Sequence, residues 1–156
     1  MAEYSANAIQ TVNPGETVVF TEVDSPCQRG FVRFREGSGS FLLNGWLPNR
    51  NCQCACSRNR EAEYLVTFGA NIAIPEGGTV GEISVAFSID GATVPATQMS
   101  VTPAAVNQYF NVSRSKSVGV WRGCCETVSI RNTSDQPILL KNVSVIFSRP
   151  DLAVTY

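Results

Sequence analysis

The stretch that decides the fold runs from Tyr64 to Gly91 and reads YLVTFGANIAIPEGGTVGEISVAFSIDG. Its first part, residues 64–74, is apolar and rich in residues that favour β-strands, and PEGGTVG then interrupts it. In EISVAFSI, residues 82–89, apolar residues alternate strictly with small ones. Asp90-Gly91 follows, a dipeptide typical of a two-residue β-hairpin turn. Alternation of period two between such turns predicts an antiparallel sheet with one buried face.

The rest of the chain repeats this pattern. No window has convincing helical periodicity, although residues 102–110 fit either one helical turn or a crossover between strands. We therefore expect an all-β fold, a ten-stranded antiparallel β-sandwich of the jelly-roll kind. Residues 1–156 should form one domain, with residues 1–15 as an N-terminal arm. The expected strands are 6–12, 17–21, 30–35, 40–46, 62–74, 82–89, 93–101, 109–121, 125–132 and 138–148.

Composition excludes several classes of function. The 156 residues carry a net charge of −1, without the basic surplus typical of nucleic-acid binders. No segment is long and apolar enough to span a membrane, and the start MAEYSANAIQ lacks the features of a secretory signal, so we expect synthesis in a cytoplasm. The chain has no histidine, which removes Ser-His-Asp and Cys-His catalysis and histidine-ligated metals. We expect neither an enzyme nor a cofactor.

The six cysteines leave three interpretations open. A zinc site is one, but C-x-C spacing with an adjacent pair matches zinc knuckles poorly. Disulfides, within or between subunits, need an oxidising setting, which a particle released from a lysed cell would meet. Free thiols that pack as small apolar groups are the third. The residues concerned are Cys27, Cys52, Cys54, Cys56, Cys124 and Cys125.

Two strands carry apolar residues on both faces, which indicates that a neighbouring subunit covers one outer face. In one strand Tyr64, Val66 and Phe68 face opposite to Leu65. In the last strand Val143, Val145 and Phe147 share a face, and Leu140 and Ile146 lie opposite. Scattered surface apolar residues are the alternative. Our candidates for contacts between subunits are Tyr64, Tyr109, Phe147 and Tyr156.

The segment 47–60 carries Arg50, Arg58 and Arg60 around the run of cysteines. These arginines predict either an ordinary solvated loop or a docking loop for an acidic partner surface.

With this strand order, nearly the whole chain resembles the TNF/C1q-like jelly roll. The resemblance is carried by FVRFREGSGSFLLNGW (31–46), by YLVTFGANIAIPEGGTVGEISVAFSIDGATVP (64–95), and by VGVWRGCCETVSIRNTS (118–134) followed by ILLKNVSVIF (138–147). It implies a homotrimer in which the outer face of one sheet packs around a threefold axis.

More narrowly, EYSANAIQTV (3–12), REGSG (35–39), VTPAAV (101–106) and RGCC (122–125) are similar to small virion structural proteins of phages and prophages of gut Firmicutes. That resemblance implies a non-enzymatic capsid decoration or head-fibre protein on the virion surface, with itself and a phage capsid or other virion protein as partners. The alternative is a recognition module of the same fold that binds a receptor, a glycan or a spore surface. Enzymes of the cupin kind share the jelly roll, but their metal sites depend on histidines that this chain lacks.

Overall fold

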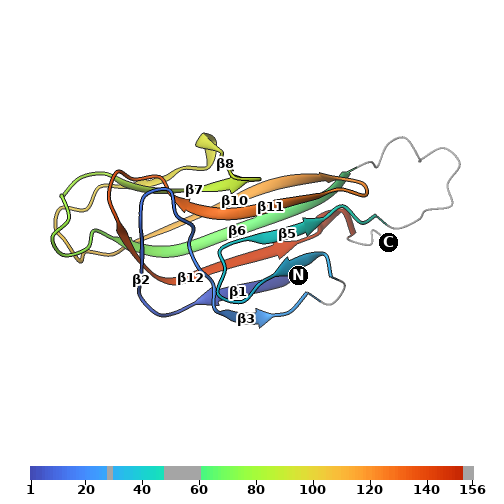
Figure 1. The fold of residues 1–156 in the computed structure, drawn as a ribbon, viewed down its shortest axis with the longest axis horizontal. Helices are drawn as coiled ribbons and strands as arrows, with labels where there is room; N and C mark the ends of the chain where they lie inside the picture. The colour runs from blue at the N-terminus through green and yellow to red at the C-terminus, as the bar shows by residue number, and fades with distance from the viewer. Residues whose placement is uncertain (28–29, 48–60, 153–156) are drawn as a thin grey trace, which may run out of the picture.

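The structure, a computed structural model, describes residues 1–27, 30–47 and 61–152. Within these ranges, twelve strands form two six-stranded antiparallel sheets that face each other (Figure 1). The first, which we call the long sheet, has the order β10 (Phe110–Trp121), β6 (Glu61–Ala73), β12 (Ile138–Ser148), β1 (Ala2–Ala6) and β3 (Glu22–Ser25), and β2 (Gln10–Val12) also pairs with β12.

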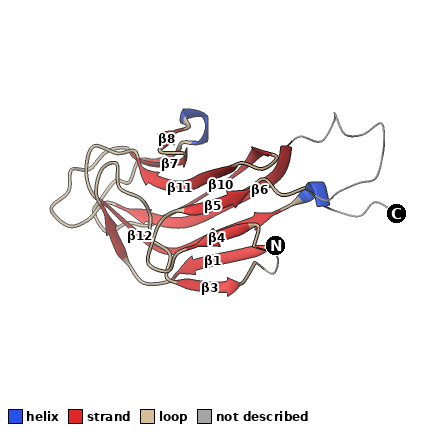
Figure 2. Cartoon of the chain, turned by 45° about the vertical axis from the view of Figure 1, so that its right-hand side comes forward, coloured by secondary structure: helices blue, strands red, loops and turns tan. Residues whose placement is uncertain are grey.

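The second, the short sheet, has the order β4 (Val32–Phe34), β5 (Phe41–Asn44), β11 (Cys125–Asn132), β7 (Ile83–Ile89) and β8 (Ala92–Thr93), and β9 (Met99–Val101) also pairs with β7. Two 3₁₀ turns, η1 (Pro95–Thr97) and η2 (Pro150–Leu152), complete the described chain (Figure 2). The predicted all-β sandwich is confirmed. Among the described ranges, no helix is long and apolar enough to cross a membrane.

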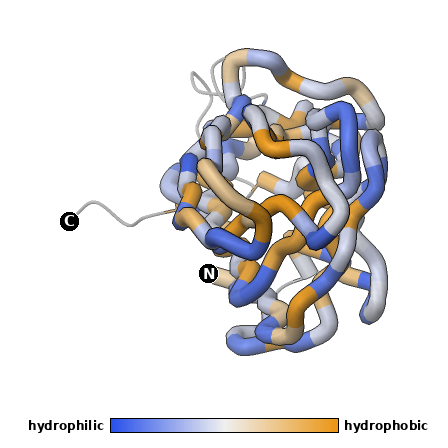
Figure 3. Tube along the Cα trace, turned by 90° about the vertical axis from the view of Figure 1, so that its left-hand side faces the viewer, coloured by the Kyte–Doolittle hydropathy of each residue, from blue (hydrophilic) through white to orange (hydrophobic). Residues whose placement is uncertain are grey.

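The alternation in the sequence explains the core. Tyr64, Val66 and Phe68 of β6 are completely buried, and apolar and polar stretches follow each other along the tube in Figure 3. The two sheets meet through large rings, as between Phe68 of β6 and Phe87 of β7, whose centroids lie 6.5 Å apart. Burial of such side chains is the main favourable term in folding, about 1.5–3 kcal/mol for each large apolar side chain.

The Asp90-Gly91 turn is as predicted. Both residues have positive φ, 51° and 84°, as a type I′ turn requires, and the turn joins β7 to β8. The Asp90 carboxylate accepts a hydrogen bond of 2.8 Å from the backbone N–H of Thr127 on β11. The side chain therefore stabilises the backbone at this turn.

The expectation of an N-terminal arm over residues 1–15 is wrong. β1 lies inside the long sheet, between β12 and β3, and its Ala2, Tyr4 and Ala6 are buried. Two alanines gave this strand a weak apolar signal, and its main partner, β12, lies far away in the sequence. β1 is thus part of the sandwich.

Other boundaries also differ. Residues 17–21 make only an isolated bridge between Thr17 and Arg131, and the next segment forms β3 instead. The single strand expected over 93–101 is interrupted by η1, because Pro95 cannot donate to a strand ladder. Residues 102–109 form a connection without a helix.

A bulge in β12 corrects the predicted orientation of Leu140. The register against β6 shifts between Lys141 and Ser144, and Asn142 has a φ of 52°. The extra residue brings both Leu140 and Val143 to the buried face, where both are completely inaccessible. Simple alternation had placed Leu140 on the outer face.

Candidate functional site

The centre of the outer face of the long sheet carries uncharged and mostly small side chains. Because Val66, Phe68 and Ala70 of β6 point into the core, their neighbours point outward. Strand register places nine outward residues in three rungs, which together we call the serine face: Ser113–Gly69–Ser144, Ser115–Thr67–Ile146 and Ser117–Leu65–Ser148.

The serine face contains little apolar surface, which corrects the expectation of a strongly apolar outer face. Leu65 is 38% exposed and Ile146 is half-buried, whereas Leu140 lies in the core. The nine residues of the face carry no charged side chain. Two of their hydroxyls, those of Thr67 and Ser115, share a hydrogen bond of 3.0 Å. Long charged side chains are common on solvated sheet faces. Interface cores are depleted of Lys, Glu and Asp, and of serine as well, so the relevant property of this face is its lack of charge.

Two of the four aromatic candidates for subunit contacts were predicted wrongly. Tyr64 is 0% and Phe147 is 1% exposed, so neither has surface left for another subunit. Tyr109 is half-buried beside the serine face, and the ammonium of Lys141 lies 4.0 Å from its ring centroid. Its contact role stays a prediction, and Tyr156 lies outside the described residues.

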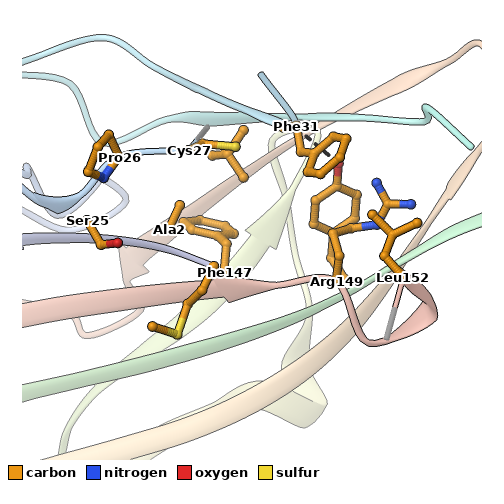
Figure 4. A pocket seen from close by; sticks show the side chains of 11 residues that line it. Ala2, Ser25, Pro26, Cys27, Phe31, Phe147, Arg149 and Leu152 are labelled. Carbon is orange, nitrogen blue, oxygen red and sulfur yellow. Dashed lines mark hydrogen bonds between the residues drawn. The ribbon is translucent and has the colours of Figure 1, made fainter. Parts of the chain in front are cut away.

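A second feature is a pocket of about 490 Å³ at the end of the sandwich where β1 begins and β12 ends. Ala2, Cys27 and Phe147 gather at one side of it, and Phe31, Arg149 and Leu152 at the other (Figure 4).

Arg149 closes this end as part of a stack of rings. Its guanidinium carbon lies 4.9 Å from the Phe31 ring centroid and 4.8 Å from that of Tyr64. The ring of Trp46, which is 44% exposed, stacks on Phe31 at 5.5 Å. A cation over aromatic faces is stabilised by their negative π surface.

The hydrogen bonds of Arg149 are mostly internal. Nε and Nη2 donate to the two carboxylate oxygens of Asp151 at 2.9 and 2.7 Å, and Nη2 also donates to the Trp46 carbonyl at 3.0 Å. Nη1 is buried, and no hydrogen-bond partner for it lies among the described residues. Since only 6% of the side chain is exposed, the guanidinium offers no open edge to a ligand from solvent. The geometry indicates a structural closure.

Burial and pairing shift the pKa values of this group. Burial would raise the pKa of Asp151, but hydrogen bonds and attraction from Arg149 outweigh it and lower that pKa. Burial would lower the pKa of Arg149, but Asp151 raises it. The pKa of Tyr64 is raised, mainly by burial, and its hydroxyl donates to the Asn44 carbonyl at 2.6 Å.

The cysteine predictions are resolved only in part. Cys27, half-buried beside the pocket, and Cys124 and Cys125, exposed in the β10–β11 hairpin, carry free thiols. In residues 1–27, 30–47 and 61–152, no cluster of three potential metal ligands occurs. The remaining cysteines and the docking-loop arginines lie outside the described residues: Cys52, Cys54, Cys56, Arg50, Arg58 and Arg60.

Sequence reasoning missed Arg149 and Asp151. Their only signal is the tripeptide Arg-Pro-Asp directly after the last strand, which does not indicate that the arginine turns back onto residues near 31, 46 and 64.

Comparison with known proteins decides the fold. No family model and no curated protein matches this chain. Among solved structures, the globular domain of zebrafish complement 1qA protein is similar, with a TM-score of 0.58 and 11% identity over 93% of this chain and 94% of that one. The Eiger TNF of S. frugiperda has a TM-score of 0.63 and 10% identity, over 99% and 93%.

The chain has the TNF/C1q-like jelly-roll fold. A third similar structure, the sugar-binding C-terminal domain of EclA, has a TM-score of only 0.41 and 12% identity, over 90% of this chain and 79% of that one.

Proposed function

We propose that this protein is a non-enzymatic structural subunit that assembles into a homotrimer through the serine face and decorates a virion as a capsid-decoration or head-fibre protein. The observation that carries the assembly is the nine-residue uncharged face on the long sheet. The virion role rests on the resemblance of the sequence to small phage structural proteins.

The serine face suits a protein partner for physical reasons. Ser, Thr and Gly cost less to desolvate than Lys or Glu, and their small side chains let two flat sheets approach closely. Leu65 and Ile146 supply apolar contact within the patch. A stable interface buries roughly 800 Å² on each partner, so surface beyond the nine residues must take part, and Tyr109 is placed to join it.

Gly69 offers a direct test of the assembly. A Cβ added there would meet nothing closer than 3.8 Å, so Gly69→Lys fits the isolated subunit but puts a charge at the centre of the face. We expect the wild-type chain to be trimeric by light scattering and Gly69→Lys to be monomeric with an unchanged circular dichroism spectrum. Ser100→Lys, on exposed β9 of the short sheet, is the matched control. A variant at Gly69 that assembles like the wild type contradicts the proposal.

The virion role needs its own test. Purified particles from a host that carries the gene should contain the protein in stoichiometric ratio to the capsid protein, and antibody labelling should place it on the particle surface. Particles that lack the protein would contradict the virion role but would not contradict the proposed homotrimer.

The pocket favours a second candidate, a surface recognition module. Its volume of about 490 Å³ lies within the range of small-molecule sites, and exposed Trp46 lies close by in the ring stack. A glycan array should then give binding that the pocket-filling variant Ser25→Trp removes. Binding that this variant leaves unchanged, or no binding at all, argues against it.

A further inference from the structure

The two edges of the long sheet carry opposite charge. At one edge, β10 holds two cations, Arg114 and Lys116, and no acidic residue. At the other edge, β1 and β3 hold Glu3, Glu22 and Asp24 and no basic residue. Between the edges lies the uncharged serine face. The serine face thus separates a positive edge from a negative one, while Glu61 and Glu63 lie at one end of β6 and Lys141 lies on β12.

Within the described residues, the ion pair of Arg149 with Asp151 involves none of these five charged side chains. Glu22 accepts a hydrogen bond of 3.1 Å from the Asn7 amide, which leaves its charge in place. Arg114, Glu22 and Asp24 are exposed, so they can meet a partner without being uncovered first.

The opposite charges also lie at the same height along the strands. One rung of the ladder runs Arg114–Phe68–Val145–Tyr4–Val23, and another runs Lys116–Val66–Phe147–Ala2. Glu3 lies between these rungs, while Asp24 falls at the register shift of β3 and Glu22 one position beyond the first rung. Cations and anions thus occupy nearly the same level at opposite edges, with Arg114 and Lys116 at core-side positions of β10 and Glu3 and Glu22 at positions on the side of the serine face.

This arrangement selects among possible assemblies. A rotation about an axis parallel to the strands does not change height, so it brings the β10 edge of one copy beside the β1–β3 edge of the next. Pairing of two identical edges would instead place like charges together, which costs energy.

We infer that neighbouring copies meet head to tail, with Arg114 and Lys116 of one copy against Glu3, Glu22 and Asp24 of the next. The inference rests on the proposed self-assembly and names its contacting edges. Charged edges also protect sheets from aggregation, but that role needs no complementary partner.

Charge reversal with rescue separates the two roles. We expect Arg114→Glu with Lys116→Glu, and separately Glu22→Lys with Asp24→Lys, each to raise the concentration of half-dissociation by at least about tenfold at low salt. Combining all four substitutions should restore assembly, because the edges are then exchanged. Arg33→Glu with Arg35→Glu, on and just after β4 of the short sheet, is the control.

Each outcome is informative once circular dichroism confirms folding. If both double variants still form trimers as the wild type does, this inference is overturned. It is also overturned if the fourfold variant assembles no better than the double variants. In both cases the proposed function stands. A wild-type chain that stays monomeric overturns both. Salt screens the attraction between exposed charges. Assembly of the wild type should therefore weaken as the salt concentration rises from about 0.05 to about 0.5 M.

Discussion

Arg149 and Asp151 act at the residue scale by closing one end of the sandwich. Arg149 contacts Asp151, the Trp46 carbonyl and the rings of Phe31 and Tyr64. These partners come from the chain after β12, the β5–β6 connection, the β3–β4 connection and β6. A charge this deeply buried is costly unless it is paired. The pair therefore joins the end of β12 in the long sheet to the connections before β4 and after β5 of the short sheet.

We expect Arg149→Met to destabilise the fold. The substitution leaves the Asp151 carboxylate, whose side chain is only 17% exposed, without its cation, and should cost about 2–3 kcal/mol in urea unfolding, below the roughly 3–5 kcal/mol of fully buried pairs. Arg33→Met, at an exposed position, should change little. Equal stability of the two variants would show that the pair is not a structural closure.

The Asp151 carboxylate should make this stabilisation depend on pH. Its folded pKa is lowered from the ordinary 3.8, so its stabilisation is present above that value and is lost as the pH falls through the lowered folded pKa. Asp151→Asn should therefore be less stable than the wild type at pH 7, and this difference in stability should shrink as the pH falls below 3.8, as measured by urea unfolding over that range. If the difference in free energy of unfolding between the wild type and Asp151→Asn does not change with pH, the ion pair does not account for the stabilisation.

At the element scale, the bulge in β12 determines which side chains reach the core. Asn142, with a φ of 52°, lets Leu140 and Val143 both point inward, and its own side chain is exposed. Asparagine tolerates this left-handed conformation, and β-branched residues do not.

Substitutions at Asn142 should separate backbone strain from side-chain effects. We expect Asn142→Val to lower stability by about 1–3 kcal/mol and Asn142→Gly to be neutral or slightly stabilising. Ser100→Val, at an exposed position of β9 without positive φ, should be tolerated. Thermal unfolding of the three variants is the measurement, and a Val variant as stable as the Gly variant would contradict the strained bulge.

How far the sequence predicts the elements depends on where their signal lies. β11 and β12 were predicted at their observed bounds, because turn residues and alternation mark them locally. β1 was missed because Ala2 and Ala6 carry little apolar signal and its partner strand is distant. The bulge at Asn142 was missed because alternation cannot register one extra residue.

The candidate site was less predictable than the fold. The serine face exists only because β10, β6 and β12 are neighbours, an order that strand patterns alone do not give. Large aromatic residues are the types expected at contacts between subunits, but Tyr64 and Phe147 fill the core. Small polar residues do not predict a contact surface from the sequence, because they form one only when the strand order places them side by side.

At the scale of the whole molecule, assembly should be linked to stability. Association of folded copies stabilises them by mass action, so the unfolding temperature of the wild type should rise with protein concentration. Gly69→Lys should show no such rise, since its charge prevents the sheets from meeting. Calorimetry at several concentrations is the check, and a wild-type transition independent of concentration would count against the interface.

The most direct test of the serine-face interface is the mass of the wild-type protein by sedimentation equilibrium at low salt across micromolar concentrations. The account predicts about three times the chain mass of 16.9 kDa, with a shift toward the single-chain mass on Gly69→Lys. A mass of 16.9 kDa at every concentration would contradict it.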